Sequence, residues 1–304
     1  MSQRNGQSGI ALRIWRLVPG LLLVLCASGI VWAQSSVVTE KSLVYCTHGD
    51  VLLRLDVAYL PIGSAMRPGL VFLPGNGWGH WGVPGYDRYQ YSNAIKIAAA
   101  HGYVAAAVEY RSSSAGQCQY PAQLLDVRSA LRWLRANHER FGLNPDRVGA
   151  VGWSSGGHLA LLLGLLDGAP RPDEVDNLQY SSKVQAVVSL AGPTELSMMY
   201  KEATYPGIPA ALAELMGGSP DQLPQRYQEA SPLYQVNTDS SPMLLIQGDQ
   251  DTEVPPNEVS LFLQKARDVG ANATLILVKG MGHENAYNHA AVLPFLDGIL
   301  MDHR

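Results

Sequence analysis

Cysteine is scarce in this chain, which has three cysteines among 304 residues. Cys26 lies in an N-terminal segment of unusual composition, which leaves Cys46 and Cys118. Two cysteines are too few for a zinc ribbon, and no other metal-ligand spacing is present, so the sequence predicts no metal site. In an exported protein the pair forms either a disulfide or two buried thiols, and the sequence does not choose between them.

Charge is also limited, and neither sign dominates. Asp and Glu total 26 against 22 Lys and Arg, for a formal net charge of −4. Residues 1–33 contain three arginines and no acidic residue, so the remainder is more acidic than the whole chain. A mildly acidic surface argues against nucleic acids and anionic membranes as partners.

Long hydrophobic runs are few, and the one at the N-terminus is informative. Residues 17–31 are apolar but are interrupted by proline and glycine, and they are short for a membrane span. Arginines precede this run, and the small residue Ala33 follows it, as at a signal-peptidase site. We therefore predict a signal peptide over residues 1–33, a secreted or periplasmic protein, and one domain over residues 34–304. An uncleaved membrane anchor is the alternative.

The rest of the chain alternates between apolar runs typical of buried strands and segments with helical periodicity. This alternation predicts an α/β fold with a mostly parallel central sheet and helices on both faces. The first two strands are expected to pair antiparallel, and a turn is expected at residues 144–146. Strands are expected at 42–46, 51–60, 69–73, 103–110, 147–151, 184–190, 243–246 and 273–278, and helices at 92–101, 121–141, 257–269 and 286–301.

Residues 193–241 form a long segment between two expected core strands. The segment is rich in proline and contains a helical piece at 210–216, but it contains no core strand. Long insertions at the carboxyl edge of a sheet are more often functional than disordered. We predict a partial cap over an active site, with a surface excursion as the alternative.

The run Gly152-Trp153-Ser154-Ser155-Gly156 follows an apolar strand and opens a helix of small residues. This is the context of a nucleophile elbow, in which a strained central residue is flanked by glycine. Ser154 is therefore the candidate nucleophile, because the helix N-terminus beside it stabilises negative charge. The alternative is an ordinary turn between a strand and a helix.

A serine nucleophile needs a histidine base and an orienting carboxylate, and in this fold they follow the serine in the order acid, then histidine. His283 lies in a glycine-rich loop after the last expected strand and is the candidate base. Asp249 and Asp251 follow the strand at 243–246, and both are placed to act as the acid. His158 falls inside the helix after Ser154 and is expected to be a packed core residue.

An oxyanion hole requires two backbone N–H groups that point at the developing charge. Ser155 N–H is the first candidate. The glycine-rich loop after an early strand offers Asn76 and Gly77, between which the sequence does not decide. Trp78 and Trp153 lie next to these groups and are candidate substrate contacts, although both could instead pack the loops.

These residues resemble those of α/β-hydrolase-fold carboxylesterases, in particular the bacterial branch near hormone-sensitive lipase and the secreted feruloyl and acetyl-xylan esterases. The similarity extends from Val51 to the C-terminus. The resemblance favours Asp251 over Asp249 as the triad acid, and Asp249 is expected to have a structural role in which it bonds the backbone of its own turn. The family's oxyanion loop reads His-Gly-Gly-Gly-Trp, whereas this chain has Pro-Gly-Asn-Gly-Trp and lacks the bracing histidine. The matching segments are 109–111, 120–122, 126–134, 142–148, 152–160, 248–255 and 282–283.

The sequence thus predicts a serine carboxylic-ester hydrolase that works through an acyl-enzyme without a cofactor. Short-chain or carbohydrate-linked acyl esters are the expected substrates. The alternatives are a secreted serine exopeptidase-like hydrolase and a non-catalytic binding protein of the same fold.

Overall fold

The computed structural model describes residues 36–301 except 62, 64, 80–86 and 115. The expected signal peptide at residues 1–33 lies outside these residues. In the described part of the chain, no helix combines the length and the apolar character needed to span a bilayer. The same part contains no group of three or more His, Cys, Asp or Glu side chains suited to a metal ion.

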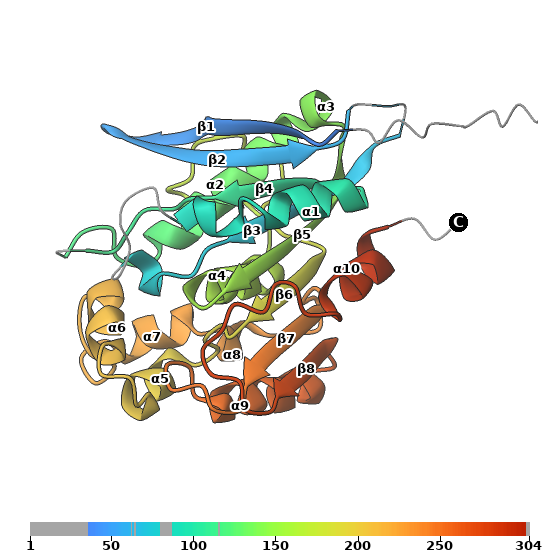
Figure 1. The fold of residues 1–304 in the computed structure, drawn as a ribbon. Coiled ribbons are helices and arrows are strands. Elements are labelled where there is room, and N and C mark those ends of the chain that lie inside the picture. The colour runs from blue at the N-terminus through green and yellow to red at the C-terminus, as the bar shows by residue number, and fades with distance from the viewer. Residues whose placement is uncertain (1–35, 62, 64, 80–86, 115, 302–304) are drawn as a thin grey trace, which may run out of the picture. The chain divides into compact units, whose positions relative to one another are not determined.

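A single eight-stranded sheet organises the described residues (Figure 1). The strand order is β1-β2-β4-β3-β5-β6-β7-β8. The pairs β1–β2 and β2–β4 are antiparallel and all the others are parallel. The antiparallel β1–β2 pair and the mostly parallel sheet confirm the prediction, whereas the β2–β4 pair was not predicted. The strands are β1 (Val38–His48), β2 (Val51–Tyr59), β3 (Arg67–Leu73), β4 (Val104–Val108), β5 (Leu143–Trp153), β6 (Ala186–Leu190), β7 (Met243–Gly248) and β8 (Ala273–Val278).

The helices that cover the sheet are α1 (Ala94–His101), α2 (Ala122–Ala136), α3 (His138–Phe141), α4 (Ser155–Leu165), α9 (Pro256–Asp268) and α10 (Val292–Leu300). Side chains of a strand point alternately to the two faces of a sheet. In β3, Leu70 and Phe72 join a hydrophobic cluster with α1 and α10, whereas Val71 and Leu73 join a second cluster with α2, α4 and α9. The sheet therefore lies between two helical layers, each with its own core (Figure 1).

Strand β5 begins earlier than the sequence predicted. The turn expected at residues 144–146 is part of this strand, whose first residue, Leu143, pairs with Arg67. The register then shifts from the pair Arg67–Leu143 to the pair Gly69–Val148, and the Asp146 N–H donates to Asn144 Oδ1 (3.0 Å). The expected turn is therefore present as a bulge within the strand.

Two expected helices are shorter than their apolar patterns. The pattern at 121–141 forms α2 and α3, because the Asn137 side chain donates to Trp133 O (2.8 Å) and caps α2. The pattern at 286–301 becomes helical only from Val292. Just before that point, His289 Nδ1 accepts the Ala291 N–H (3.2 Å) and caps the helix start.

The segment between β6 and β7 contains four short helices: α5 (Leu196–Glu202), α6 (Ile208–Met216), α7 (Pro224–Ala230) and α8 (Pro232–Gln235). Helix α6 contains the helical piece expected at 210–216 and packs against the 3₁₀ turn η1 (Gly77–Gly79). The N–H groups of Thr204 and Tyr205 both donate to Thr252 O (3.0 Å each). The segment therefore contacts the loops that follow both β3 and β7.

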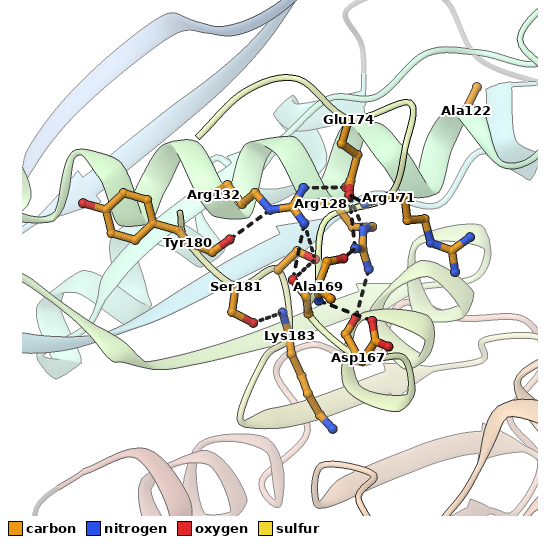
Figure 2. Close-up of polar contacts among 12 residues, drawn as sticks. Ala122, Arg128, Arg132, Asp167, Ala169, Arg171, Glu174, Tyr180, Ser181 and Lys183 are labelled. Atoms are coloured by element: carbon orange, nitrogen blue, oxygen red, sulfur yellow. Dashed lines mark hydrogen bonds and ion pairs between the residues drawn. The ribbon is translucent and has the colours of Figure 1, made fainter. Parts of the chain in front are cut away.

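Three buried arginines of α2 hold the loop between α4 and β6, and Figure 2 shows two of them, Arg128 and Arg132. Glu174 accepts from Arg128 Nε (2.7 Å) and pairs with Arg132 Nη1 (2.6 Å). Arg132 Nε also donates to Tyr180 O (3.0 Å), and Arg135 donates to several carbonyl groups of the same loop. Burial alone would raise the pKa of Glu174, but its bonds to the two arginines lower this pKa to about 2.

The two cysteines are free thiols in this structure. Cys46 is buried in β1, and Cys118 is partly exposed in the loop after β4. The sequence left open whether Cys46 and Cys118 form a disulfide or remain thiols, and in this structure they remain thiols.

Candidate active site

Ser154 occupies a sharp turn between β5 and α4. Its backbone angles, φ 54° and ψ −125°, lie in a region that side chains other than glycine rarely adopt. A Cβ on Gly152 would meet Gly156 O at 2.1 Å, and one on Gly156 would meet Leu73 O at 2.0 Å. The flanking glycines are therefore required by the turn, which is the elbow geometry that the sequence predicted.

The structure brings Ser154, His283 and Asp251 into one line of hydrogen bonds. His283 Nε2 lies 2.8 Å from Ser154 Oγ, and His283 Nδ1 lies 2.8 Å from Asp251 Oδ2. The three groups come from the carboxyl ends of β5, β7 and β8. A proton can pass from the hydroxyl to the imidazole while the carboxylate orients the ring.

Asp251 is held by several donors besides the imidazole. Its Oδ1 accepts the N–H groups of Glu253 and Val254 (2.9 Å each). Its Oδ2 accepts from Gln247 Nε2 (2.9 Å), at the end of β7. These bonds orient the carboxylate toward His283. Gln247 is a supporting residue that the sequence analysis missed.

Asp249 has a structural position, although not the expected one. We expected it to bind the backbone of its own turn, but its Oδ1 accepts the N–H of Gly280 in the histidine loop (2.6 Å). The two loops also touch at Gly248, where a Cβ would meet Met281 O at 2.1 Å. The acid loop and the histidine loop are thus joined directly, which stabilises the Asp251–His283 distance.

The loop after β3 is braced by a network of side chains. Asn76 N–H donates to Ser155 Oγ (3.0 Å), and Asn76 Oδ1 accepts the Gly79 N–H (2.8 Å). The Tyr110 hydroxyl lies within hydrogen-bond distance of Pro74 O (2.7 Å), Asn76 Oδ1 (3.1 Å) and Ser155 Oγ (3.1 Å). The network braces the loop in a chain that lacks the bracing histidine of the esterase pattern. Tyr110 lies in the matching segment 109–111, but nothing in the sequence indicated its role in the loop.

Gln90 in the 3₁₀ turn η2 (Asp87–Tyr91) hydrogen-bonds to the loop after β3. Its amide donates to Gly75 O (2.9 Å) and accepts from Gly75 N (3.4 Å). With Asn76 N–H turned toward Ser155 Oγ, Gly77 N–H is left without a hydrogen-bond acceptor among the described residues. Gly77 has φ 61°, which suits glycine.

Trp78 and His158 form a buried pair behind the elbow. Trp78 is 2% exposed, and its indole N–H donates to His158 Nδ1 (3.2 Å). His158 Nε2 then donates to Ala230 O (2.8 Å), so the ring is the neutral tautomer, and burial lowers its pKa to about 4. His158 is a packed core residue, as expected. The Trp78 ring packs in the core, which is the alternative that the sequence left open, and its contact with substrate stays a prediction.

Trp153 packs against the base, with its ring centroid 5.4 Å from that of His283. Its contact with substrate stays a prediction. Glu253 is a further residue of the site that the sequence analysis did not single out. Its Oε2 lies 3.7 Å from His283 Nε2, and burial raises the pKa of its carboxyl against the opposing effect of the imidazole.

Known proteins are similar to this chain in sequence and in fold. The model of the BD-FAE family matches residues 55–266. The esterase LipC of Mycobacterium tuberculosis is 28% identical over 235 residues, which are 77% of this chain and 56% of LipC. The chain spans about half the length of the curated relatives it matches.

Two solved structures share the architecture. A truncated carbohydrate esterase from gut microbiota superposes with a TM-score of 0.71 at 24% identity, covering 87% of this chain and 97% of that one. The esterase Est2 of Thermogutta terrifontis with propionate bound has a TM-score of 0.66 at 24% identity, over 87% and 92% of the two chains. The observed sheet and helices are those of the α/β-hydrolase fold that the resemblance implied. The chain belongs to the BD-FAE family.

Proposed function

We propose that this protein is a serine carboxylic-ester hydrolase that acts through an acyl-enzyme. The observation that carries the proposal is the line of Ser154 Oγ, His283 and Asp251, with both imidazole nitrogens at 2.8 Å from their partners. Membership of the BD-FAE family and the esterase relatives support it.

In the first half of the cycle, His283 Nε2 removes the proton of Ser154 as its Oγ attacks the ester carbonyl carbon. Negative charge then develops on the carbonyl oxygen. The amides of Ser155 and Gly77 are assigned to this oxyanion, because the Asn76 N–H is bonded to the Ser155 hydroxyl. Asp251 keeps the imidazole in the tautomer that accepts at Nε2 and stabilises its charged form.

In the second half, the C–O bond to the alcohol breaks and His283 gives its proton to the leaving oxygen. Water then attacks the acyl-enzyme while the same imidazole removes a water proton. When the Ser154 ester bond breaks, that proton returns to Ser154 Oγ. The acid is released and the starting state is restored.

The substrates assigned are short-chain or carbohydrate-linked acyl esters. Two relatives of the same fold support this assignment, one described as a carbohydrate esterase and the other solved with propionate. Helices α5–α8 act in this proposal as a partial cap, since their segment contacts both the η1 turn and Thr252 beside the acid. A cap that reaches both loops limits the room for a long acyl chain.

The test combines a p-nitrophenyl ester series, from acetate to palmitate, with labelling by a fluorophosphonate probe. Ser154→Ala should lose the label and at least about 10³-fold in kcat. Ser260→Ala is the matched control, because it removes a hydroxyl from an exposed serine of α9 outside the site, and it should still be labelled at Ser154. A folded wild-type protein that hydrolyses no ester, or that cleaves dipeptidyl anilides instead, would contradict the proposal.

A further inference from the structure

Glu253 places a second carboxylate beside the imidazole of His283. It lies two residues after Asp251 on the loop that follows β7, and its Oε2 is 3.7 Å from His283 Nε2. Asp251 bonds to the opposite ring nitrogen, Nδ1. The two carboxylates therefore face different sides of one histidine, and only Asp251 has the orienting position.

The side chain of Glu253 is held in this place but is open to the site. Its backbone N–H donates to Asp251 Oδ1 (2.9 Å), and its side chain is 23% exposed. Within the described residues, the charged groups that face its carboxylate are His283 and Asp251. Among the described residues, no arginine or lysine pairs with the Glu253 carboxylate. Its negative charge therefore acts on any substrate group that lies near His283 Nε2.

In the proposed reaction, Nε2 is the atom that gives its proton to the leaving alcohol. The alcohol oxygen must then lie within hydrogen-bond distance of Nε2, and so within about 6.5 Å of Glu253 Oε2. A carboxylate at this range accepts hydrogen bonds from hydroxyl groups, attracts cations and repels anions. It acts on the alcohol part of the ester and on the leaving-group side of the site.

We propose that Glu253 is the specificity residue for the alcohol part of the substrate, selecting hydroxyl-bearing or cationic alcohols and disfavouring anionic ones. The inference rests on the proposed function, since it requires that Ser154 and His283 cleave esters. It assigns the polar alcohol of an ester, such as a sugar, to the side of the site where Glu253 lies.

The test uses three phenyl acetates that differ only in the para substituent of the leaving phenol: trimethylammonium, carboxamide or carboxylate. The ratio of kcat/KM for the cationic over the anionic ester is measured at pH 8 for wild type and Glu253→Gln. The intrinsic reactivities of the esters cancel when the two ratios are compared. Removing the charge should lower the ratio by about fivefold.

Glu284→Gln is the matched control, because it removes the same charge from an exposed side chain next to His283. It should leave the ratio within about twofold of wild type, as expected for a solvent-screened charge. Equal ratios in wild type and Glu253→Gln, with the neutral ester hydrolysed by both, would overturn the inference alone. Absence of hydrolysis of all three esters by wild type would overturn the proposed function and this inference with it.

Discussion

Acid should destabilise this protein through His158, which lies one turn after Ser154 in α4. Its Nδ1 accepts the Trp78 indole N–H and its Nε2 donates to Ala230 O, and the ring is fully buried. Protonation of Nδ1 would turn this acceptor into a donor, and its N–H would then face the Trp78 indole N–H with no acceptor between them. Burial accordingly lowers the pKa of His158 to about 4 in the folded protein, against about 6.5 in an unfolded chain.

The free energy of unfolding decreases in acid because the unfolded state binds a proton at His158 more tightly than the folded state does. Above about pH 7 neither state is protonated at this position, so the group does not change the free energy of unfolding. As the pH falls from about 6.5 toward 4, the unfolded chain takes up the proton first and the free energy of unfolding decreases. At pH 4.5 the loss amounts to about 2.5 kcal/mol.

Urea unfolding of wild type, His158→Gln and His158→Asn at pH 7.5 and pH 4.5 measures this loss. Both variants lack the titrating ring and should be less stable than wild type at pH 7.5, because they lose one or both buried hydrogen bonds. Their deficit should shrink by about 2.5 kcal/mol at pH 4.5, while the titrations shared by the three proteins cancel. A deficit equal at the two pH values in both variants would refute the reasoning.

Four further substitutions test other parts of the structure. Tyr110→Phe should lower kcat for ester hydrolysis about tenfold with KM nearly unchanged, because the oxyanion loop loses its brace; an unchanged kcat would show that the brace is dispensable. Gly156→Ala places a Cβ 2.0 Å from Leu73 O and should abolish soluble expression or lower Tm sharply in calorimetry; a wild-type Tm would contradict the close approach. Burial raises the pKa of Glu258 well above its usual value. The unfolded chain therefore loses this proton first, and wild type should lose stability relative to Glu258→Gln as the pH rises from about 5 to 8. A Tm difference between the two proteins that is constant with pH would argue against a neutral carboxyl. Glu174→Gln leaves buried arginines unpaired and should cost about 3 kcal/mol in urea unfolding, and a loss below about 1 kcal/mol would mean that the loop carbonyl groups suffice.

Several features of the site could be predicted because they depend on neighbours in the chain. The spacing of Gly152 and Gly156 around Ser154 predicts the elbow, since only short-range backbone sterics decide that turn. The alternation of apolar strands and helices predicts a mostly parallel sheet, because each strand must bury both of its faces. The position of His283 after the last strand places it at the same edge as Ser154 for the same reason.

Other features required the tertiary structure, because they join residues far apart in the chain. The sequence pattern alone left Asp249 and Asp251 as alternatives, and the fold turns Asp251 toward His283 but Asp249 toward the backbone of Gly280. A Trp next to a glycine-rich loop looks the same whether it meets substrate or the core, and only packing against His158 placed Trp78 inside.

The same limit explains the supporting residues whose roles the motifs did not reveal. Tyr110 reaches the loop at Asn76 from a neighbouring strand end, and Glu253 reaches His283 across two loops. The sequence by itself determined the fold class, because this follows from local backbone geometry and periodic burial. The family and the order of nucleophile, acid and base followed from the resemblance of its motifs to those of known esterases. Only the tertiary structure showed that the Asp251 carboxylate bonds to His283, that the Asn76 N–H bonds to the Ser155 hydroxyl and that the Trp78 ring lies in the core, because those distances depend on how separate loops pack.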